Sequence, residues 1–221
     1  MIPKLLFEIS HCQNFTSFTS SGKANKSCND ILEFQKKEGA KNIIDFQIPE
    51  PWSGDIINAP ILVLSSNPSY STDEIYPNST WPKPMIADFF INRFKDRGER
   101  YSWVYKNKVL NKGGTRGPSV RYWSSINKRL EELLGFTPKQ GIDFCITEIV
   151  HCKSRKEIGV SSALPECSKN FFDKKIKISA AKLIVSFGSF VENAFGNNET
   201  LIGIPIIYLP HPNAFKPKKA L

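Results

Sequence analysis

The side chains most capable of chemistry lie in two turns that are far apart in the chain. Asn67 and His211 each sit in a proline-containing turn directly after a short apolar run, residues 60–64 and residues 204–209. Runs of this kind, bounded by turn residues, are typical of buried strands. In open α/β sheets ligands bind beyond the carboxyl ends of the strands, so two such turns can meet at one crevice. The pattern predicts an active site in which an amide and an imidazole act on the same ligand.

Predicted strands and helices alternate around these turns. Two further strands are expected at residues 144–150 and 183–187. Helices are expected at residues 29–39 (capped by Asn29 or Asp30), 122–135 (stopped by Gly135), 165–181 and 190–195. Strands that alternate with helices favour a parallel sheet covered on both faces, which is an α/β fold.

The chain has enough apolar residues for one core. With 221 residues and 40% hydrophobic content, it needs no disulfides to fold. We expect a single domain over residues 1–221, with an N-terminal extension at about residues 1–47 and an insert at about residues 71–118. No internal repeat is evident.

The charge favours an anionic partner. Thirty Lys and Arg against 21 Asp and Glu give a formal charge of +9 at pH 7. An excess of this size is compatible with nucleic-acid binding, although it also serves solubility.

The sequence predicts an intracellular protein with no membrane partner. No run of 18 or more apolar residues exists, and the N-terminus is charged too early for a signal peptide. Five cysteines, an odd number, do not suggest a secreted disulfide framework and are expected to be thiols or metal ligands. We expect a cytoplasmic, nucleoid or nuclear monomer without an obligatory protein partner.

Several short motifs from residue 48 to the end resemble those of the uracil-DNA glycosylase superfamily. In order they are Pro51-Trp52, Asn67-Pro68-Ser69, the segment Ile146–Lys153, the segment Leu183–Ser189, and His211-Pro212-Asn213. Each motif is short, but their order and spacing together are specific. The chain is most similar to branches with Asn-Pro in the first motif and His-Pro in the last. The resemblance implies a three-layer α/β/α fold with a four-stranded parallel sheet in the order 2-1-3-4.

The resemblance also implies an activity, the hydrolysis of the N-glycosidic bond of uracil or another deaminated or modified base in DNA. Asn67 would position the attacking water, and His211 would hydrogen-bond the base oxygen on which negative charge develops. The target nucleotide would be flipped out of the duplex into a pocket. No lysine in the motifs suggests a Schiff base, so the enzyme is expected to be monofunctional, and the hydrolysis requires no metal.

Other residues are assigned to the site by the same resemblance. Base contacts are expected from Ser65, Ser66, Tyr70 and Glu148, with Trp81, Phe89 or Phe90 as alternative aromatic walls. Contacts with the DNA backbone are expected from Ser69, Pro212, Asn213 and Lys216.

Two features depart from the family pattern. Serines replace glycines on both sides of Asn67-Pro68, which adds bulk and hydroxyl groups. Glu148 stands where many relatives have a base-reading Asn. An ionised carboxylate only accepts hydrogen bonds and would repel the carbonyl oxygens of uracil. Either a protonated Glu148 or a base with an exocyclic amine would restore complementarity; alternatively Glu148 faces away from the pocket and pairs with a neighbouring Lys or Arg.

The cysteines leave two interpretations open. Cys152 and Cys167 match the second ligand pair of iron–sulfur glycosylases, and Cys12 and Cys28 could supply the other two thiolates. Fifteen residues separate Cys12 from Cys28, whereas those relatives place this pair only a few residues apart. Free buried thiols are therefore the favoured interpretation, and Cys145 is expected to be a core residue.

Two other functions remain open. The altered loop around Asn67 and the presence of Glu148 would also suit a binder of modified bases or nucleic acid that does not cleave. A third class, a hydrolase of free nucleosides or nucleotides, would show little salt-dependent DNA binding.

Overall fold

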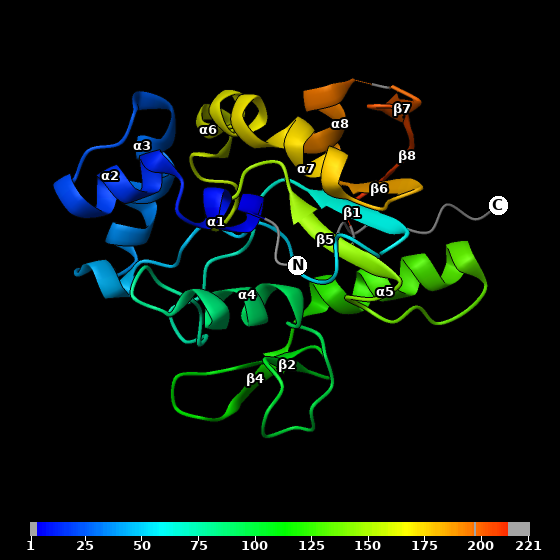
Figure 1. The fold of residues 1–221 in the computed structure, drawn as a ribbon, viewed down its shortest axis with the longest axis horizontal. Coiled ribbons are helices and arrows are strands. Elements are labelled where there is room, and N and C mark those ends of the chain that lie inside the picture. The colour runs from blue at the N-terminus through cyan, green and yellow to red at the C-terminus, as the bar shows by residue number, and fades with distance from the viewer. Residues whose placement is uncertain (1–3, 197, 212–221) are drawn as a thin grey trace.

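Four apolar runs form parallel strands at the centre of the structure, a computed structural model that describes residues 4–196 and 198–211 (Figure 1). The strands are β1 (Ile61–Ser65), β5 (Phe144–Glu148), β6 (Leu183–Phe187) and β8 (Ile204–Leu209). β1 pairs with β5 on one side and with β6 on the other, and β6 also pairs with β8. The predicted α/β class with a parallel sheet is confirmed.

The prediction of a four-stranded sheet is wrong in the number of strands. A fifth strand, β7 (Thr200–Leu201), runs antiparallel to β8, so the full order is β5-β1-β6-β8-β7. Counted among themselves, the parallel strands keep the order 2-1-3-4, and β7 extends the sheet beyond β8. Ile202 and Gly203 form the two-residue turn with φ of 51° and 80°. A β-branched residue is rarely found at positive φ, so no local pattern in the sequence predicts this hairpin.

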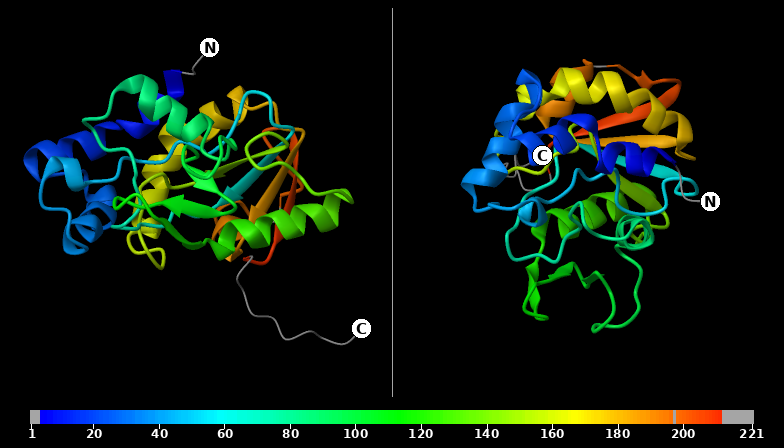
Figure 2. Two further views of the ribbon diagram at one scale, coloured as in Figure 1. Left: turned by 90° about the horizontal axis from the view of Figure 1, so that it is seen from below. Right: turned by 60° about the vertical axis from the view of Figure 1, so that its left-hand side comes forward.

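Helices cover both faces of the sheet (Figures 1 and 2). Leu62 and Leu64 point into one core, whereas Ile61 and Val63 point into the other, as strand alternation requires. The second core is closed by α5 (Arg121–Leu134) through Ile126 and Leu130. The first core is closed by α6 (Val160–Cys167), α7 (Asp173–Ile178) and α8 (Ser189–Phe195). None of the helices within the described ranges is both long and apolar enough to cross a membrane.

The predicted helices are found with shifted ends. α5 ends as expected at Gly135, which caps it in the left-handed conformation. The helix expected at 165–181 begins earlier and consists of α6, a π-helical turn η2 (Ser168–Phe172) and α7, which ends at Ile178. The helix expected at 29–39 is α3 (Lys26–Lys37), and its cap is Asn25, whose side chain accepts a hydrogen bond from Cys28 N at 3.0 Å.

The N-terminal region contains two helices that the sequence did not predict, α1 (Lys4–Ser10) and α2 (Gln13–Ser21). The hydroxyls of Thr19, Ser20 and Ser21 donate hydrogen bonds to main-chain carbonyls one helical turn earlier. A Ser/Thr-rich segment is typical of a loop, so the sequence does not indicate this helix. Side chains from α1, α2 and α3 lie in the same core cluster as Leu62 and Leu64. The extension is therefore packed on the sheet.

The insert forms local structure of its own. It contains α4 (Lys83–Ile91) and a small antiparallel sheet of β2 (Val104–Tyr105), β3 (Lys108–Leu110) and β4 (Arg116–Ser119). In Figure 1 this sheet lies apart from the central one, below α4. A 3₁₀ turn, η1 (Ile43–Asp45), precedes the central sheet.

Gly159 allows α6 to approach α3 closely. Its φ is +74°, and a Cβ atom at this position would lie 2.4 Å from Ile31 N and 2.8 Å from Ile31 Cα. Gly22 has a similar φ of +72° but open space around it. We expect Gly159→Ala to lower the free energy of unfolding by about 3 kcal/mol and Gly22→Ala by about 1 kcal/mol, because only the first adds a backbone clash to the left-handed strain. Urea denaturation of both variants measures the difference; equal losses would contradict the packing described here.

Candidate active site

The loops that follow β1 and β5 are bound to each other along their main chains. Ile149 N donates to Ser65 O at 2.9 Å, Val150 N to Ser66 O at 3.0 Å, and Ser154 N to Pro68 O at 3.2 Å. The Asn67 turn is thereby fixed to the segment after β5 at the carboxyl edge of the sheet. β1 is also the strand with chain crossovers to both sides, which is where α/β folds place their ligands.

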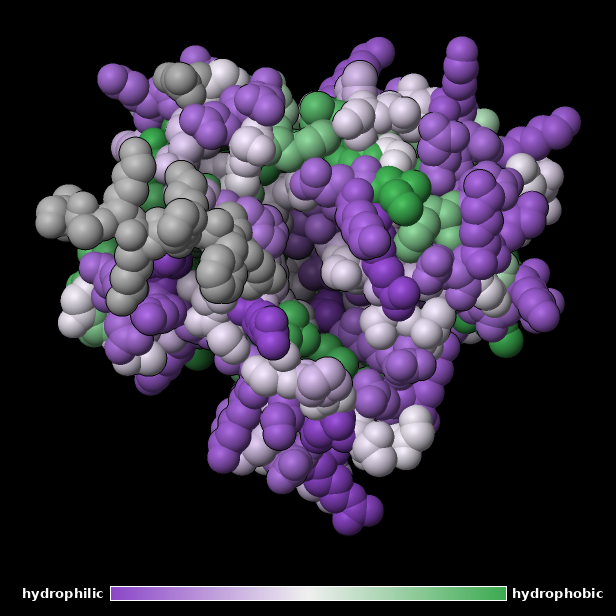
Figure 3. Space-filling view, turned by 180° about the vertical axis from the view of Figure 1, so that it is seen from behind, coloured by the Kyte–Doolittle hydropathy of each residue, from purple (hydrophilic) through white to green (hydrophobic). Residues whose placement is uncertain are grey.

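A cavity of about 600 Å³ opens at this edge. It brings together six of the predicted site residues: Ser65, Ser66, Asn67, Ser69, Glu148 and His211. One side of the cavity is formed by the insert and the start of α5, through Val109, Asn111, Pro118 and Val120 among others. Figure 3 shows a hollow in this face of the molecule with hydrophilic side chains deep inside it.

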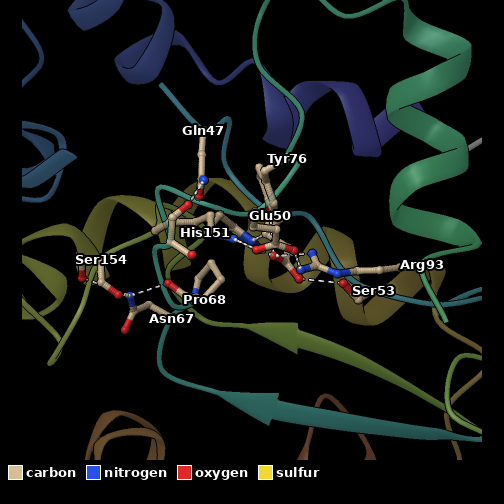
Figure 4. A network of polar contacts seen from close by, with 12 residues as sticks. Gln47, Glu50, Ser53, Asn67, Pro68, Tyr76, Arg93, His151 and Ser154 are labelled. Carbon is tan, nitrogen blue, oxygen red and sulfur yellow. Dashed lines mark hydrogen bonds and ion pairs between the residues drawn. The ribbon is translucent and has the colours of Figure 1, made fainter. Parts of the chain in front are cut away.

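Asn67 has a fixed amide orientation. Its Nδ2 donates to Pro68 O at 3.0 Å and to Ser154 Oγ at 3.1 Å, with Ser154 O at 3.4 Å (Figure 4). A flipped amide would set its oxygen against two carbonyl oxygens, so the nitrogen must face Ser154. The Oδ1 atom is therefore turned away from these partners and is available to a ligand or a water.

His211 follows β8 and reaches the same cavity. Its ring stacks on Tyr122 with a centroid distance of 5.7 Å and an interplanar angle of 28°. It also lies over Gly188, where an added Cβ would come within 3.7 Å of the His211 side chain. Desolvation lowers the pKa of His211, although Glu157 opposes this. The imidazole is neutral at neutral pH and can donate one hydrogen bond.

Buried charges form the floor of the cavity (Figure 4). Arg93 Nη1 lies 3.1 Å from Glu50 Oε2, and Arg93 Nη2 lies 2.6 Å from Glu74 Oε1. Lys153 Nζ is 3.6 Å from Glu74 Oε2 and 3.5 Å from the centroid of the Tyr76 ring. Burial alone would raise the pKa of Glu50, but Arg93 and Lys153, with hydrogen bonds from Ser53 and Tyr76, outweigh it and lower the pKa.

Glu148 ends β5 inside the cavity and is 4% exposed. Its Oε2 atom has no hydrogen-bond partner among the described residues. Burial, followed by the charge of Glu50, raises the pKa of Glu148 well above its ordinary value, although Lys175, Arg93 and Lys153 oppose the shift. The alternative in which Glu148 points away and pairs with a Lys or Arg does not fit this placement.

Tyr70 does not line the cavity, contrary to the prediction. It is buried and packs edge-on against Phe34 with a centroid distance of 5.8 Å. Trp81, Phe89 and Phe90 also pack among themselves rather than on the cavity. The aromatic wall is formed instead by Tyr122 and Trp123. Both lie in the helix expected at residues 122–135, to which the sequence assigns no contact with the ligand, and the cavity reaches the first turn of α5.

Some predicted residues lie outside the part of the chain that the structure describes. These are the proposed DNA-backbone contacts Pro212, Asn213 and Lys216.

The sequence did not single out the charged floor. Glu50 stands between two prolines, and Arg93 follows an apolar helix. Neither setting marks a charged residue as buried, and the partners are separated by 19 to 43 residues along the chain. Lys153 ends the segment Ile146–Lys153, and the resemblance implies no role for its side chain.

A second cavity, of about 340 Å³, is lined by four cysteines. Cys12, Cys28, Cys152 and Cys167 all reach it, whereas Cys145 lies in the core beside the sheet. All five thiols are free. Burial raises the pKa of Cys28 and of Cys167 to about 12, and the neighbouring thiols add to both shifts. Cys12 and Cys28 therefore lie close to Cys152 and Cys167 in space, although fifteen residues separate Cys12 from Cys28 in the chain.

These thiols do not converge on one point. Among residues 4–196 and 198–211, no three His, Cys, Asp or Glu side chains are grouped so as to hold a single metal ion. A polynuclear iron–sulfur cluster, by contrast, is held by four thiolates distributed around it. Four thiols around one cavity, three of them buried and Cys12 partly exposed, are a donor set of that kind.

Comparisons with known proteins leave the family open. The chain matches no family model, and no curated protein matches its sequence.

The charged floor should contribute strongly to stability. Removing one partner of a buried ion pair leaves an uncompensated charge, so we expect Arg93→Met to lower the free energy of unfolding by about 3–5 kcal/mol. Arg129 is the matched control, because it forms an exposed pair with Glu132 at 2.7 Å. Arg129→Met should cost less than about 1 kcal/mol. Guanidinium denaturation of both variants tests this, and equal costs would show that the floor is not stabilising.

Proposed function

We propose that the protein is a monofunctional DNA glycosylase that removes uracil or another deaminated or modified base. The observation that carries the proposal is the meeting of Asn67 and His211 at one cavity, with the Asn67 amide fixed by Ser154. An oriented amide oxygen and a neutral imidazole are the two groups that hydrolysis of an N-glycosidic bond needs.

The reaction separates charge, and each group acts on one side of it. The bond between the sugar C1′ and the base nitrogen breaks, and its electron pair leaves with the base. His211 donates a hydrogen bond to the base oxygen that becomes negative, a contact that strengthens in the transition state. Asn67 Oδ1 holds a water whose oxygen bonds to the cationic C1′. The proton that this water loses passes to solvent, and the departed base anion takes up a proton from solvent, so that the products are the neutral base and the abasic sugar. The weak basicity of an amide is sufficient because the leaving group departs early.

The surroundings suit a flipped base. The cavity volume lies in the range typical of small-ligand sites, and Tyr122 and Trp123 provide an aromatic wall. The net charge of +9 favours approach to DNA. The DNA backbone would follow the adjoining groove of about 450 Å³, which shares Ser66, Asn67, Ser69 and His211 with the cavity.

Lys153 lines the cavity and must be considered as a nucleophile. Burial lowers its pKa, while Glu74 and Glu50 oppose this. An ammonium held between two carboxylates and over the Tyr76 ring has no free lone pair. We therefore propose hydrolysis by water, without an imine intermediate, and expect no borohydride-trapped adduct with DNA.

Substitution of the two reactive residues tests the proposal. We expect Asn67→Ala and His211→Ala each to slow single-turnover base release by about 100-fold or more, because each removes a transition-state contact. The substrates are single- and double-stranded oligonucleotides containing uracil, hypoxanthine or xanthine, and abasic sites are detected by alkali cleavage. Asn58→Ala is the control, since Asn58 is exposed and its side-chain amide donates a hydrogen bond to the Asp55 carboxylate, outside the cavity.

Other outcomes would replace the proposal. Tight binding of modified DNA without base release would indicate a non-cleaving binder. Release of the base from free nucleosides or nucleotides, together with little salt-dependent DNA binding, would indicate a nucleoside or nucleotide hydrolase.

We further propose that Cys12, Cys28, Cys152 and Cys167 hold a structural iron–sulfur cluster. The donor set fits, because a cluster binds thiolates and its iron would compensate the charge that burial now disfavours. When bound, the cluster would join α2, α3, the loop after β5 and α6. It takes no part in the hydrolysis.

Iron analysis tests this cofactor. Protein purified without oxygen should contain about four iron atoms per chain and absorb near 400 nm. Cys152→Ala and Cys28→Ala should lose both signals, whereas Cys145→Ala should keep them because Cys145 is outside the cavity. The proposal would be contradicted if the wild-type protein contained no iron and if anaerobic reconstitution with iron and sulfide left its melting temperature unchanged. That result would favour free thiols.

A further inference from the structure

Three buried carboxyls line the active-site cavity, and they differ in their partners. Glu50 and Glu74 are both bound by Arg93, with Lys153 beside them. Glu148 lies equally deep but is contacted by no described cation through its side chain, and its Oε2 has no hydrogen-bond partner. Of the three, Glu148 is the carboxyl left for a ligand.

The nearby cations are occupied elsewhere. Arg93 is shared between Glu50 and Glu74. Lys175 is fully buried, and its Nζ donates to the main-chain carbonyl of Glu148 rather than to the carboxyl. The same Nζ lies 3.4 Å from His151 Nε2. A carboxylate anion without a partner is costly in such a site, and retaining a proton removes the cost.

We propose that Glu148 is a third catalytic group, a neutral carboxylic acid that binds the cyclic-amide edge of the extruded base. The inference rests on the proposed glycosylase function. A neutral carboxyl presents an acceptor and a donor side by side, the complement of a ring N–H next to a carbonyl. Uracil, hypoxanthine and xanthine carry this edge.

The donor also assists departure of the base. The carbonyl oxygen that accepts from Glu148 gains negative charge as the glycosidic bond breaks, so this hydrogen bond strengthens in the transition state. The carboxyl keeps its proton throughout, and the step needs no co-reactant. Cytosine and adenine have no carbonyl next to a ring N–H, so the same contact gives their departure no comparable help.

The charged groups around Glu148 define its pH dependence. They are Glu50 and Glu74, the cations Arg93, Lys153 and Lys175, and the phenol Tyr122. Because burial and the charge of Glu50 raise the pKa of Glu148, its acid form persists to a higher pH than that of an ordinary glutamic acid and is lost as the pH rises further. The pKa of His211 is lowered, so His211 stays neutral over this range. Burial lowers the pKa of Lys175 to about 8, so it titrates in the alkaline range as well.

Three variants test the proposal by single-turnover base release from uracil-containing DNA. Glu148→Gln keeps a donor and an acceptor, so its rate should stay within about tenfold of wild type, whereas Glu148→Leu should lose about 100-fold. The wild-type rate should fall with rising pH, and this fall should disappear in Glu148→Gln. Glu132→Gln, an exposed carboxyl paired with Arg129, is the control and should change nothing. Denaturation curves check that each variant is folded.

Specific results would overturn it. One is base release by Glu148→Gln that is as slow as base release by Glu148→Leu. Another is a wild-type rate that rises with pH. A third is a decrease of the rate at alkaline pH that persists in Glu148→Gln and is therefore caused by Lys175. DNA carrying N3-methyluracil, which lacks the ring N–H, should react about 100-fold more slowly than uracil DNA. Equal rates for cytosine and uracil would also refute the substrate class. If the wild-type protein released no base from any substrate, the glycosylase function itself would fail.

Discussion

The buried Arg93 guanidinium is the constraint around which the active site is arranged. A charge 2% exposed must be compensated, and here Glu50 and Glu74 compensate it from two segments that lie apart in the chain. Glu50 belongs to the strand-like segment before β1, which pairs with β5 through Ser53 and Ile146. Glu74 belongs to the start of the insert. The ion network therefore joins the sheet edge, the insert and the end of α4 around one cavity.

The same network determines what the remaining groups can do. Arg93 and Lys153 are committed to Glu50 and Glu74, which leaves Glu148 without a charged partner and favours its acid form. The same carboxylates, Glu50 and Glu74, oppose the lowering of the Lys153 pKa by burial and so disfavour an amine nucleophile in the site. The chemistry proposed for this cavity is thus that of neutral hydrogen-bonding groups, Asn67, His211 and Glu148, surrounded by charges that compensate one another.

The segment after β5 connects the two cavities. In three consecutive residues, Cys152 reaches the thiol cavity, Lys153 reaches the charged floor, and Ser154 holds the amide of Asn67. Parallel strands make this possible, because their carboxyl ends, with the loops that follow, lie at one edge of the sheet. Main-chain hydrogen bonds join the segment after β5 to the turn that carries Asn67, so the site residues are held rigidly.

The sequence by itself determined the parallel strands, among them the one that carries Glu148, the amphipathic helix α5, and the turns that carry Asn67 and His211, because hydrophobic period and proline punctuation are local signals. It missed the β7 hairpin, since Ile202 adopts a positive φ that its side chain disfavours, and it missed α1 and α2, whose serines and threonines resemble a loop. Only the tertiary structure decided that Tyr122 rather than Tyr70 borders the cavity, that four distant cysteines share another, and that Arg93 joins two carboxylates. These depend on contacts between residues far apart in the chain, for which a single sequence carries no periodic signal.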